Sequence, residues 1–156
     1  MSNRANYKKI LAVASSGGHW MQLLRVTKSL ENKFEVCYVS TLSDRETSVE
    51  GRSFQLINDF SRTDAVKIVT VFIQAIRIVR NEKPDVVITT GAAPGLVMVF
   101  VGWLFRKKTI WIDSLANVEH LSLSGRIASL FVSRIYTQWK GLQDGSKIVF
   151  AGSVLK

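Results

Sequence analysis

His19 is the residue whose type and position point most directly to chemistry. It follows Ser16, Gly17 and Gly18 and precedes a stretch with the composition of a helix. Adjacent glycines let the backbone turn tightly and approach a ligand, and the first turn of a helix offers unpaired N–H groups and a partial positive charge. The segment therefore predicts a site for a phosphate or a sugar hydroxyl, with His19 as a proton acceptor or donor. It would equally suit a structural turn, because it lacks the full dinucleotide-binding fingerprint.

A second glycine-containing loop follows the apolar run 85–89. Thr90, Gly91 and Gly95 lie in this loop or just inside the next helix, where Pro94 suits a first helical turn. Ligands of open parallel sheets bind at the carboxyl ends of the strands, so hydroxyl and amide donors here could contact the same ligand as His19. Ordinary helix capping explains these residues equally well.

A third polar segment follows the apolar run 108–112. Asp113 and Ser114 begin it, and Glu119 and His120 lie further along, where we expect them to be solvated. Asp113 is predicted at the same sheet edge as His19, so the two could share an acid/base task or bind sugar hydroxyls. Asp113 could instead cap backbone N–H groups.

Apolar runs of strand length alternate with stretches of helix length, which is typical of an α/β fold with a doubly wound parallel sheet. Its helices must hold the three loops at one edge of the sheet. The predicted strands are 9–14, 35–40, 54–57, 85–89, 108–112, 133–137 and 147–151, and the predicted helices are 19–31, 63–82, 94–105 and 122–132.

The chain is both basic and apolar. Its 156 residues suit a single domain, and it carries a net charge of +9 with 47% hydrophobic residues. The basic residues are scattered rather than clustered with aromatic residues, which predicts an anionic membrane surface as a partner and no nucleic acid. The one cysteine, Cys37, lies in an apolar run, so we predict buried packing and no metal site. The N-terminus lacks an apolar signal core, which favours the cytoplasmic side.

Two predicted helices are unusually apolar. The helix 63–82 has only a narrow polar stripe, so we expect it to face two apolar partners. One is its own sheet, and the other could be a second protein chain, lipid or, the reading we favour, a neighbouring helix. The segment 94–105 carries no charge and would be about 18 Å long, too short to span a bilayer. It could be a core helix or an interfacial helix. The residues predicted to contact the membrane are Val99, Trp103, Phe105, Arg106, Lys107 and Lys108.

Four ordered motifs carry a family resemblance: 15–19 (SSGGH), 90–95 (TGAAPG), 111–114 (WIDS) and 122–126 (SLSGR). Together they resemble the acceptor-binding, membrane-associating subunits of split GT-B glycosyltransferases. These are the Alg-fourteen-like subunits of lipid-linked oligosaccharide synthesis and the PssD-like proteins of exopolysaccharide and capsule synthesis. The set is more distantly similar to the N-terminal half of the peptidoglycan transferase MurG.

The resemblance implies a single Rossmann-like half-domain over 1–156, of the GT-B N-terminal type. It implies an inverting transfer from a UDP-sugar, bound by a separate donor-binding subunit, to a sugar on polyprenyl diphosphate. It also implies that the chain is inactive alone and needs no metal or cofactor other than the donor. The chain lacks the N-terminal spanning helix of the eukaryotic relatives, so we expect peripheral attachment at the cytoplasmic face of the membrane through the body of the protein.

The resemblance assigns roles to the motif residues. Gly17, Gly18 and His19 would approach the acceptor sugar or diphosphate, with His19 as a candidate base. Asp113 falls where relatives usually have Glu, and its shorter side chain leaves its catalytic role open. Two alternatives remain at this stage: a noncatalytic membrane scaffold for the partner, and a stand-alone nucleotide- or phosphate-binding Rossmann module.

Overall fold

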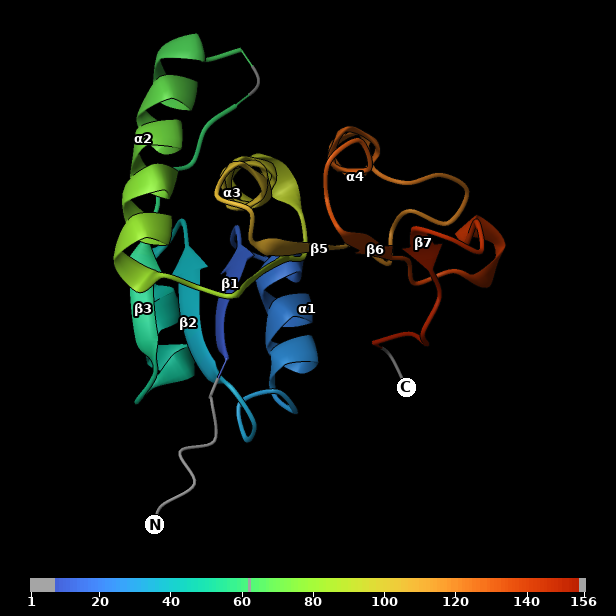
Figure 1. The fold of residues 1–156 in the computed structure, drawn as a ribbon, viewed down its shortest axis with the longest axis horizontal. Coiled ribbons are helices and arrows are strands. Elements are labelled where there is room, and N and C mark those ends of the chain that lie inside the picture. The colour runs from blue at the N-terminus through green and yellow to red at the C-terminus, as the bar shows by residue number, and fades with distance from the viewer. Residues whose placement is uncertain (1–7, 62, 155–156) are drawn as a thin grey trace.

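The fold is built on one seven-stranded parallel sheet (Figure 1). The computed structural model describes residues 8–61 and 63–154; the predicted domain 1–156 also includes residues that lie outside this described part. The strand order is β3-β2-β1-β4-β5-β6-β7. The strands are β1 (Lys9–Ala14), β2 (Glu35–Ser40), β3 (Ser53–Leu56), β4 (Val86–Thr89), β5 (Lys108–Ile112), β6 (Arg134–Tyr136) and β7 (Ile148–Val149).

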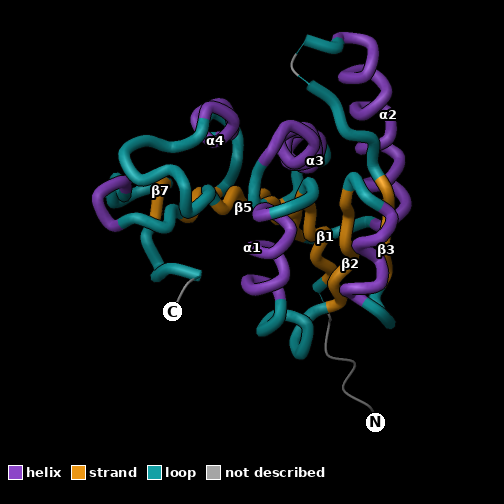
Figure 2. The backbone as a smooth tube through the Cα atoms, turned by 180° about the vertical axis from the view of Figure 1, so that it is seen from behind, coloured by secondary structure: helices purple, strands orange, loops and turns teal. Residues whose placement is uncertain are grey.

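Helices cover both faces of the sheet, as Figures 1 and 2 show. They are α1 (Gly18–Thr27), α2 (Ala65–Glu82), α3 (Ala92–Leu104) and α4 (Leu123–Ala128). Side chains of β1 alternate between the faces, because successive residues of a strand point to opposite sides. Ile10 and Ala12 join the core beneath α1, whereas Leu11 and Val13 join the core shared with α2, α3 and α4. The predicted doubly wound α/β fold is confirmed.

The predicted elements all occur, with shifted ends. α1 ends at Thr27 rather than at residue 31, because a turn begins there, with the Leu30 N–H donating to the Thr27 carbonyl. α4 has six residues, about half the length predicted. Two short 3-10 helices, Ser43–Val49 and Lys140–Leu142, were not predicted. In the first of them, Thr47 and Ser48 hydroxyls donate to backbone carbonyls three residues earlier, a local arrangement that leaves no hydrophobic period to detect.

α2 has both of the apolar partners expected for it. It packs against α3 and the sheet, with Val71, Ala75 and Val79 in the core. Its N-terminal half projects beyond the strands in Figure 1, and Val66 and Val69 are exposed there. The Asp64 carboxylate caps the helix by accepting a hydrogen bond from the Lys67 N–H. Within the described residues, no helix is both long enough and apolar enough to cross a bilayer.

Lys9 forms ion pairs at the amino edge of the sheet. Lys9 Nζ lies 2.7 Å from a carboxylate oxygen of Glu82 and 3.1 Å from one of Glu35. Burial of Glu82 opposes its ionised form, but the hydrogen bonds from Lys9 and Gln55 outweigh that effect and lower its pKa. Cys37 is fully buried nearby, as predicted, and its burial raises the pKa of the thiol to about 11. The thiol is therefore protonated and unreactive at neutral pH.

Candidate functional site at the carboxyl edge of the sheet

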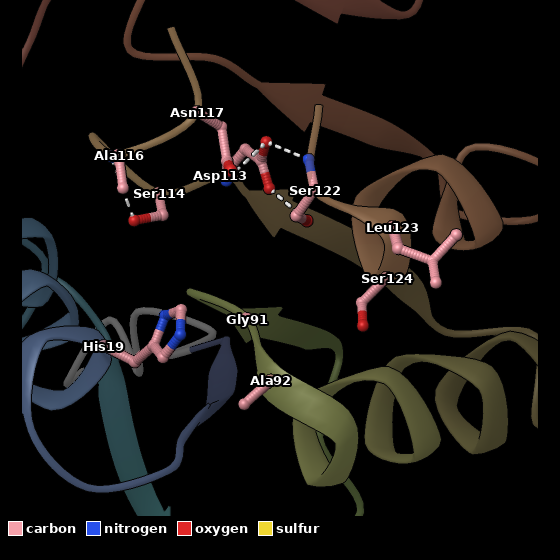
Figure 3. Close-up of a pocket in the computed structure, with 10 residues that line it drawn as sticks. All are labelled: His19, Gly91, Ala92, Asp113, Ser114, Ala116, Asn117, Ser122, Leu123 and Ser124. Carbon is pink, nitrogen blue, oxygen red and sulfur yellow. Dashed lines mark hydrogen bonds between the residues drawn. The ribbon is translucent and has the colours of Figure 1, made fainter. Parts of the chain in front are cut away.

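The three polar loops meet at a cavity of about 290 Å³ (Figure 3). They follow β1, β4 and β5, which are neighbours in the sheet, so their carboxyl ends open on the same edge. The cavity is lined by His19, Gly91, Ala92, Asp113, Ser114, Ala116, Asn117, Ser122, Leu123 and Ser124.

His19 is the second residue of α1 and is tied to the loop after β4. Its Nδ1 lies 2.9 Å from the Thr90 carbonyl oxygen, and the Thr90 hydroxyl donates to the His19 carbonyl at 2.6 Å. Thr90 is fully buried, so its hydroxyl is occupied by His19 rather than open to a ligand. The structure thus places the predicted ligand residue Thr90 behind His19.

Asp113 forms the opposite wall of the cavity and is 2% exposed. Its carboxylate accepts four hydrogen bonds: from Trp111 Nε1 (3.0 Å), Asn117 Nδ2 (3.3 Å), the Ser122 N–H (2.9 Å) and the Ser122 hydroxyl (2.7 Å). Four donors occupy the positions that a carboxylate offers. Asp113 therefore fastens the loop 114–122 and the start of α4, and it caps a backbone N–H, the alternative raised for it from the sequence.

The loop after β4 adopts a backbone that few residues tolerate. Gly91 has φ of 126° and Ala92 has φ of 66°, so both lie in the left-handed region beside the cavity. Gly95 was predicted to bind the ligand, but it is buried, and a Cβ there would lie 2.1 Å from Thr89 Oγ1. Its role is close packing of α3 on β4, since only glycine leaves room for that strand.

The glycine loop before α1 lies beside the cavity rather than in its wall. Gly17 and Gly18 are exposed, and Ser16 is half-buried. A Cβ built at either glycine meets nothing within 4 Å, so the space around this loop is open. Gly17, with φ of 72°, precedes α1 without a side-chain cap, which leaves the first N–H groups of the helix accessible.

The polar groups that line the cavity are hydroxyls, an amide, the His19 imidazole and the Asp113 carboxylate. None of its ten lining residues is a lysine or an arginine. Ser114 Oγ accepts a hydrogen bond from the Ala116 N–H and keeps its own proton to donate. Sequence reasoning missed Asn117, Ser122 and Ser124. The preference of serine for helix N-caps could have revealed Ser122, whose hydroxyl accepts from the Gly125 N–H, whereas no local pattern indicates Asn117.

The residues predicted to contact a membrane lie at the far end of α3. This helix runs antiparallel to the strands, so its last turn is at the amino edge of the sheet, about 20 Å from the cavity for 13 residues. Trp103 and Phe105 are 45% and 39% exposed there. Arg106 and Lys108 are exposed, and Lys107 is half-buried.

The prediction that Val99 contacts the membrane is wrong. Val99 is fully buried in the core between α3 and its neighbours, so it cannot contact lipid in this fold. The outer surface of α3 is instead formed by Phe100, Trp103 and Leu104. The Phe100 ring contacts Phe72 of α2, and Phe100, Trp103 and Phe131 after α4 contact one another, with centroids 5.3–6.2 Å apart.

The surface of α2, α3 and α4 is apolar and cationic. The stretches 65–81, 86–112 and 120–134 contain no aspartate or glutamate. Exposed apolar side chains occur on each helix or directly after it: Val66, Val69, Ile73, Trp103, Leu104, Phe105, Leu123, Ile127 and Leu130.

An open parallel sheet with a cavity at the carboxyl ends of its strands defines the class of fold: a Rossmann-like half-domain of the GT-B type. MurG from Acinetobacter baumannii matches it with a TM-score of 0.77 at 17% identity, over 92% of this chain and 45% of that chain. A UDP-GlcNAc 2-epimerase from Methanocaldococcus jannaschii matches with a TM-score of 0.70 at 14% identity, over 93% of this chain and 45% of its own. The chain therefore spans less than half the length of these two solved proteins, and at such identity the likeness concerns the fold.

Sequence comparison assigns the family. Residues 52–154 match the family described as "Oligosaccharide biosynthesis protein Alg14 like", and the chain belongs to it. Two relatives are named UDP-N-acetylglucosamine transferase subunit ALG14. The protein from Yarrowia lipolytica is 26% identical over 87% of this chain and 76% of its own length. The human protein is 28% identical over 94% of this chain and 82% of its own length. The resemblance deduced from the four motifs is confirmed.

Proposed function

We propose that this chain is the acceptor-binding subunit of a two-chain glycosyltransferase. The transfer would move a sugar from a UDP-sugar, with inversion, to a saccharide on polyprenyl diphosphate. Membership of the Alg14-like family supports this proposal, as does the naming of its relatives as transferase subunits. The fold also agrees with it, because the chain matches 45% of the length of MurG, about one half of a GT-B fold. A separate donor-binding subunit would supply the second half.

The observation that carries the proposal is the cavity beside His19, which is lined by hydroxyl and amide groups and the Asp113 carboxylate, and by no lysine or arginine. Such a lining suits the hydroxyls of an uncharged sugar better than a diphosphate, which favours cationic or backbone N–H donors. His19 would take the proton of the acceptor hydroxyl while that oxygen bonds to the anomeric carbon of the donor. The bond from the anomeric carbon to the UDP oxygen breaks, and UDP leaves with the electron pair. Asp113 would position the cavity wall.

The acceptor diphosphate would lie outside the cavity, against the glycine loop. The open space at Gly17 and Gly18, next to Ser16, and the uncapped start of α1 support this placement. The reaction as proposed uses no metal ion and no cofactor besides the UDP-sugar donor. A bacterial product of this chemistry would be an exopolysaccharide, a capsule or a lipid-linked oligosaccharide.

The outer surface of α2, α3 and α4 would bind an anionic membrane at its cytoplasmic face. Its apolar side chains and the absence of aspartate and glutamate from 65–81, 86–112 and 120–134 support this peripheral attachment. Trp103 and Phe105 would enter the headgroup region, with Arg106, Lys107 and Lys108 near lipid phosphates. The proposed set of membrane contacts thus omits Val99 and adds Leu104 and the exposed side chains of α2 and α4.

Reconstitution with a candidate donor-binding subunit from the same organism tests the proposal. UDP-N-acetylglucosamine and N-acetylglucosaminyl-diphosphate-polyprenol are the probes, and product is measured with the pair and with each chain alone. We expect transfer by the pair only. Transfer by the isolated chain at the rate of the pair would contradict the two-chain proposal.

Two other outcomes would identify the alternative functions. Full activity of a pair carrying His19→Asn would leave this chain only a scaffolding role. Saturable binding of free UDP by the isolated chain, with no effect of the partner, would indicate a stand-alone nucleotide-binding module. The His120→Asn variant is the matched control, because His120 is an exposed histidine outside the lining of the His19 cavity.

A further inference from the structure

We propose that Thr90 and Gly91 are positioning residues that hold the His19 imidazole as the Nδ1–H tautomer and present Nε2 as the proton acceptor. The catalytic consequence rests on the proposed function, in which His19 is the base. The tautomer itself is a property of the isolated chain and can be measured without a reaction.

The hydrogen bond at Nδ1 determines which ring nitrogen carries the proton. Nδ1 lies 2.9 Å from the Thr90 carbonyl oxygen, and a carbonyl oxygen can only accept. Nδ1 must therefore donate, and in the neutral ring the lone pair is then on Nε2. Among the described residues, none forms a hydrogen bond with Nε2, and the ring lines the cavity. A base for an acceptor hydroxyl needs such an unoccupied lone pair within the cavity.

Hydrogen bonds fix Thr90 both to His19 and to β1. Its hydroxyl donates to the His19 carbonyl at 2.6 Å, so the two residues are joined by a reciprocal pair of hydrogen bonds. Its own N–H donates to the Val13 carbonyl at the end of β1, at 3.4 Å. Thr90 thus connects the ends of β1 and β4 to the first turn of α1. This connection holds the carbonyl at the position that Nδ1 requires.

Gly91 allows the imidazole to come this close. A Cβ at position 91 would lie 2.9 Å from His19 Cε1 and 3.0 Å from Nδ1, closer than side chains tolerate. Gly91 also has φ of 126°, a conformation that other residues rarely adopt. Any side chain at this position would displace the ring from the Thr90 carbonyl. The glycine is therefore needed for the position of a histidine 72 residues earlier in the sequence.

Long-range ¹H–¹⁵N correlation spectra of the intact, ¹⁵N-histidine-labelled chain test the inference. The chain contains two histidines, so His120→Asn assigns both rings. At mildly alkaline pH, where imidazoles are neutral, we expect the protonated nitrogen of His19 to be Nδ1 and the unprotonated nitrogen to be Nε2. A His19 ring that carries its proton mainly on Nε2 would overturn the inference.

Two matched variants test Thr90. Thr90→Ser keeps the hydroxyl and the carbonyl, so we expect an unchanged Nδ1–H signal. Thr90→Val has a similar shape but lacks the hydroxyl, and we expect it to increase the Nε2–H population. In the reconstituted pair, Thr90→Val should lower kcat by about 10-fold with little change in KM, a smaller loss than removal of the base. Wild-type tautomer populations in Thr90→Val would overturn the role of its hydroxyl.

Gly91→Ala provides the second test. We expect loss of the Nδ1–H preference in folded protein, as judged from the backbone amide spectrum. If this variant does not fold, the Thr90 pair of variants still decides the question. An Nδ1–H tautomer together with full activity of His19→Asn would support the positioning and contradict the proposed base. An Nε2–H tautomer with inactive His19→Asn would contradict the positioning and leave the proposed function intact.

Discussion

The two ends of α3 differ in exposure and charge. At its N-terminus, Gly91 and Ala92 adopt left-handed backbone conformations beside a cavity lined by His19, Asp113 and uncharged polar groups. At its C-terminus, about 20 Å away, Trp103 and Phe105 are exposed next to three consecutive basic residues. One end has a constrained, hydrogen-bonded arrangement, and the other has an accessible apolar and cationic surface.

This difference agrees with the two functions that we propose for one uncharged helix. Its middle is buried, with Met98 and Val99 in the core, so the two ends are held rigidly apart. Chemistry is expected where side chains are fixed by buried hydrogen bonds, as at His19 and Asp113. Binding to a fluid partner such as a lipid surface requires only exposure and charge, as at Trp103 and Arg106. Variants at one end should therefore leave the function of the other end intact.

The largest expected effect is at the cavity end. His19→Asn keeps a donor near the position of Nδ1 and so preserves the bond to Thr90, but it removes the proton acceptor. We expect kcat/KM of the reconstituted pair to fall by about 10²–10⁴-fold, the usual contribution of a general base. Binding to anionic liposomes should remain at the wild-type level, which a sedimentation assay would check.

Asp113→Asn should have the next largest effect, on stability. It replaces a fully bonded buried carboxylate and turns one acceptor into a donor that faces other donors. We expect a loss of about 2 kcal/mol in the free energy of unfolding, measured by urea denaturation, and a Tm lower by about 4–8 °C. The control is Asp44→Asn at an exposed carboxylate, where a change below about 0.5 kcal/mol is expected. Equal losses in both variants would show that Asp113 does not fasten the cavity wall.

Much of the fold was predictable because its signals are local. The buried strands are short apolar runs that end at glycine or polar residues, and each predicted strand and helix was found. Which face of 94–105 is buried was not predictable, because a helix without charged residues has no polar stripe to orient it. That is why Val99 was wrongly placed at the surface.

The candidate site was predictable only in part. The three loops could be placed at one edge because parallel strands share their direction. The hydrogen bonds that fix His19 and Asp113 could not be predicted. His19 bonds to a backbone carbonyl 71 residues away, and Asp113 accepts from the N–H of Ser122, nine residues along a loop. Tertiary contacts of this kind leave no spacing pattern in the sequence.

A smaller effect is expected at the other end of α3. Trp103→Gln combined with Leu104→Gln removes exposed apolar surface, and we expect liposome affinity to fall by about 10-fold. Met21→Gln is the matched control, because Met21 is exposed on α1, on the opposite face of the sheet. Affinity should also decrease with added salt, since the basic residues contribute through screened charges. If the Met21 variant lost as much affinity, the membrane surface would have been placed on the wrong face.

The smallest effect concerns a pair away from both ends. The pKa of Glu82 is lowered because the hydrogen bonds from Lys9 and Gln55 outweigh the effect of burial. A lowered pKa in the folded state means that this stabilisation is present above the pKa of the unfolded chain and is lost as the pH falls through the folded pKa. We expect about 1 kcal/mol of acid-sensitive stability. Urea denaturation across acidic pH should show a weaker pH dependence in Glu82→Gln, and an unchanged profile would contradict this assignment.

The most direct test of the account is the initial rate of sugar transfer to a short-chain, water-soluble acceptor in the absence of a bilayer. The rate is measured for three reconstituted pairs, in which this chain is wild type, carries His19→Asn, or carries both Trp103→Gln and Leu104→Gln. We expect the His19 variant to transfer about 10²–10⁴-fold more slowly than wild type, and the Trp103 and Leu104 variant to transfer at the wild-type rate. A wild-type rate with His19→Asn would contradict the claim that this chain supplies the base.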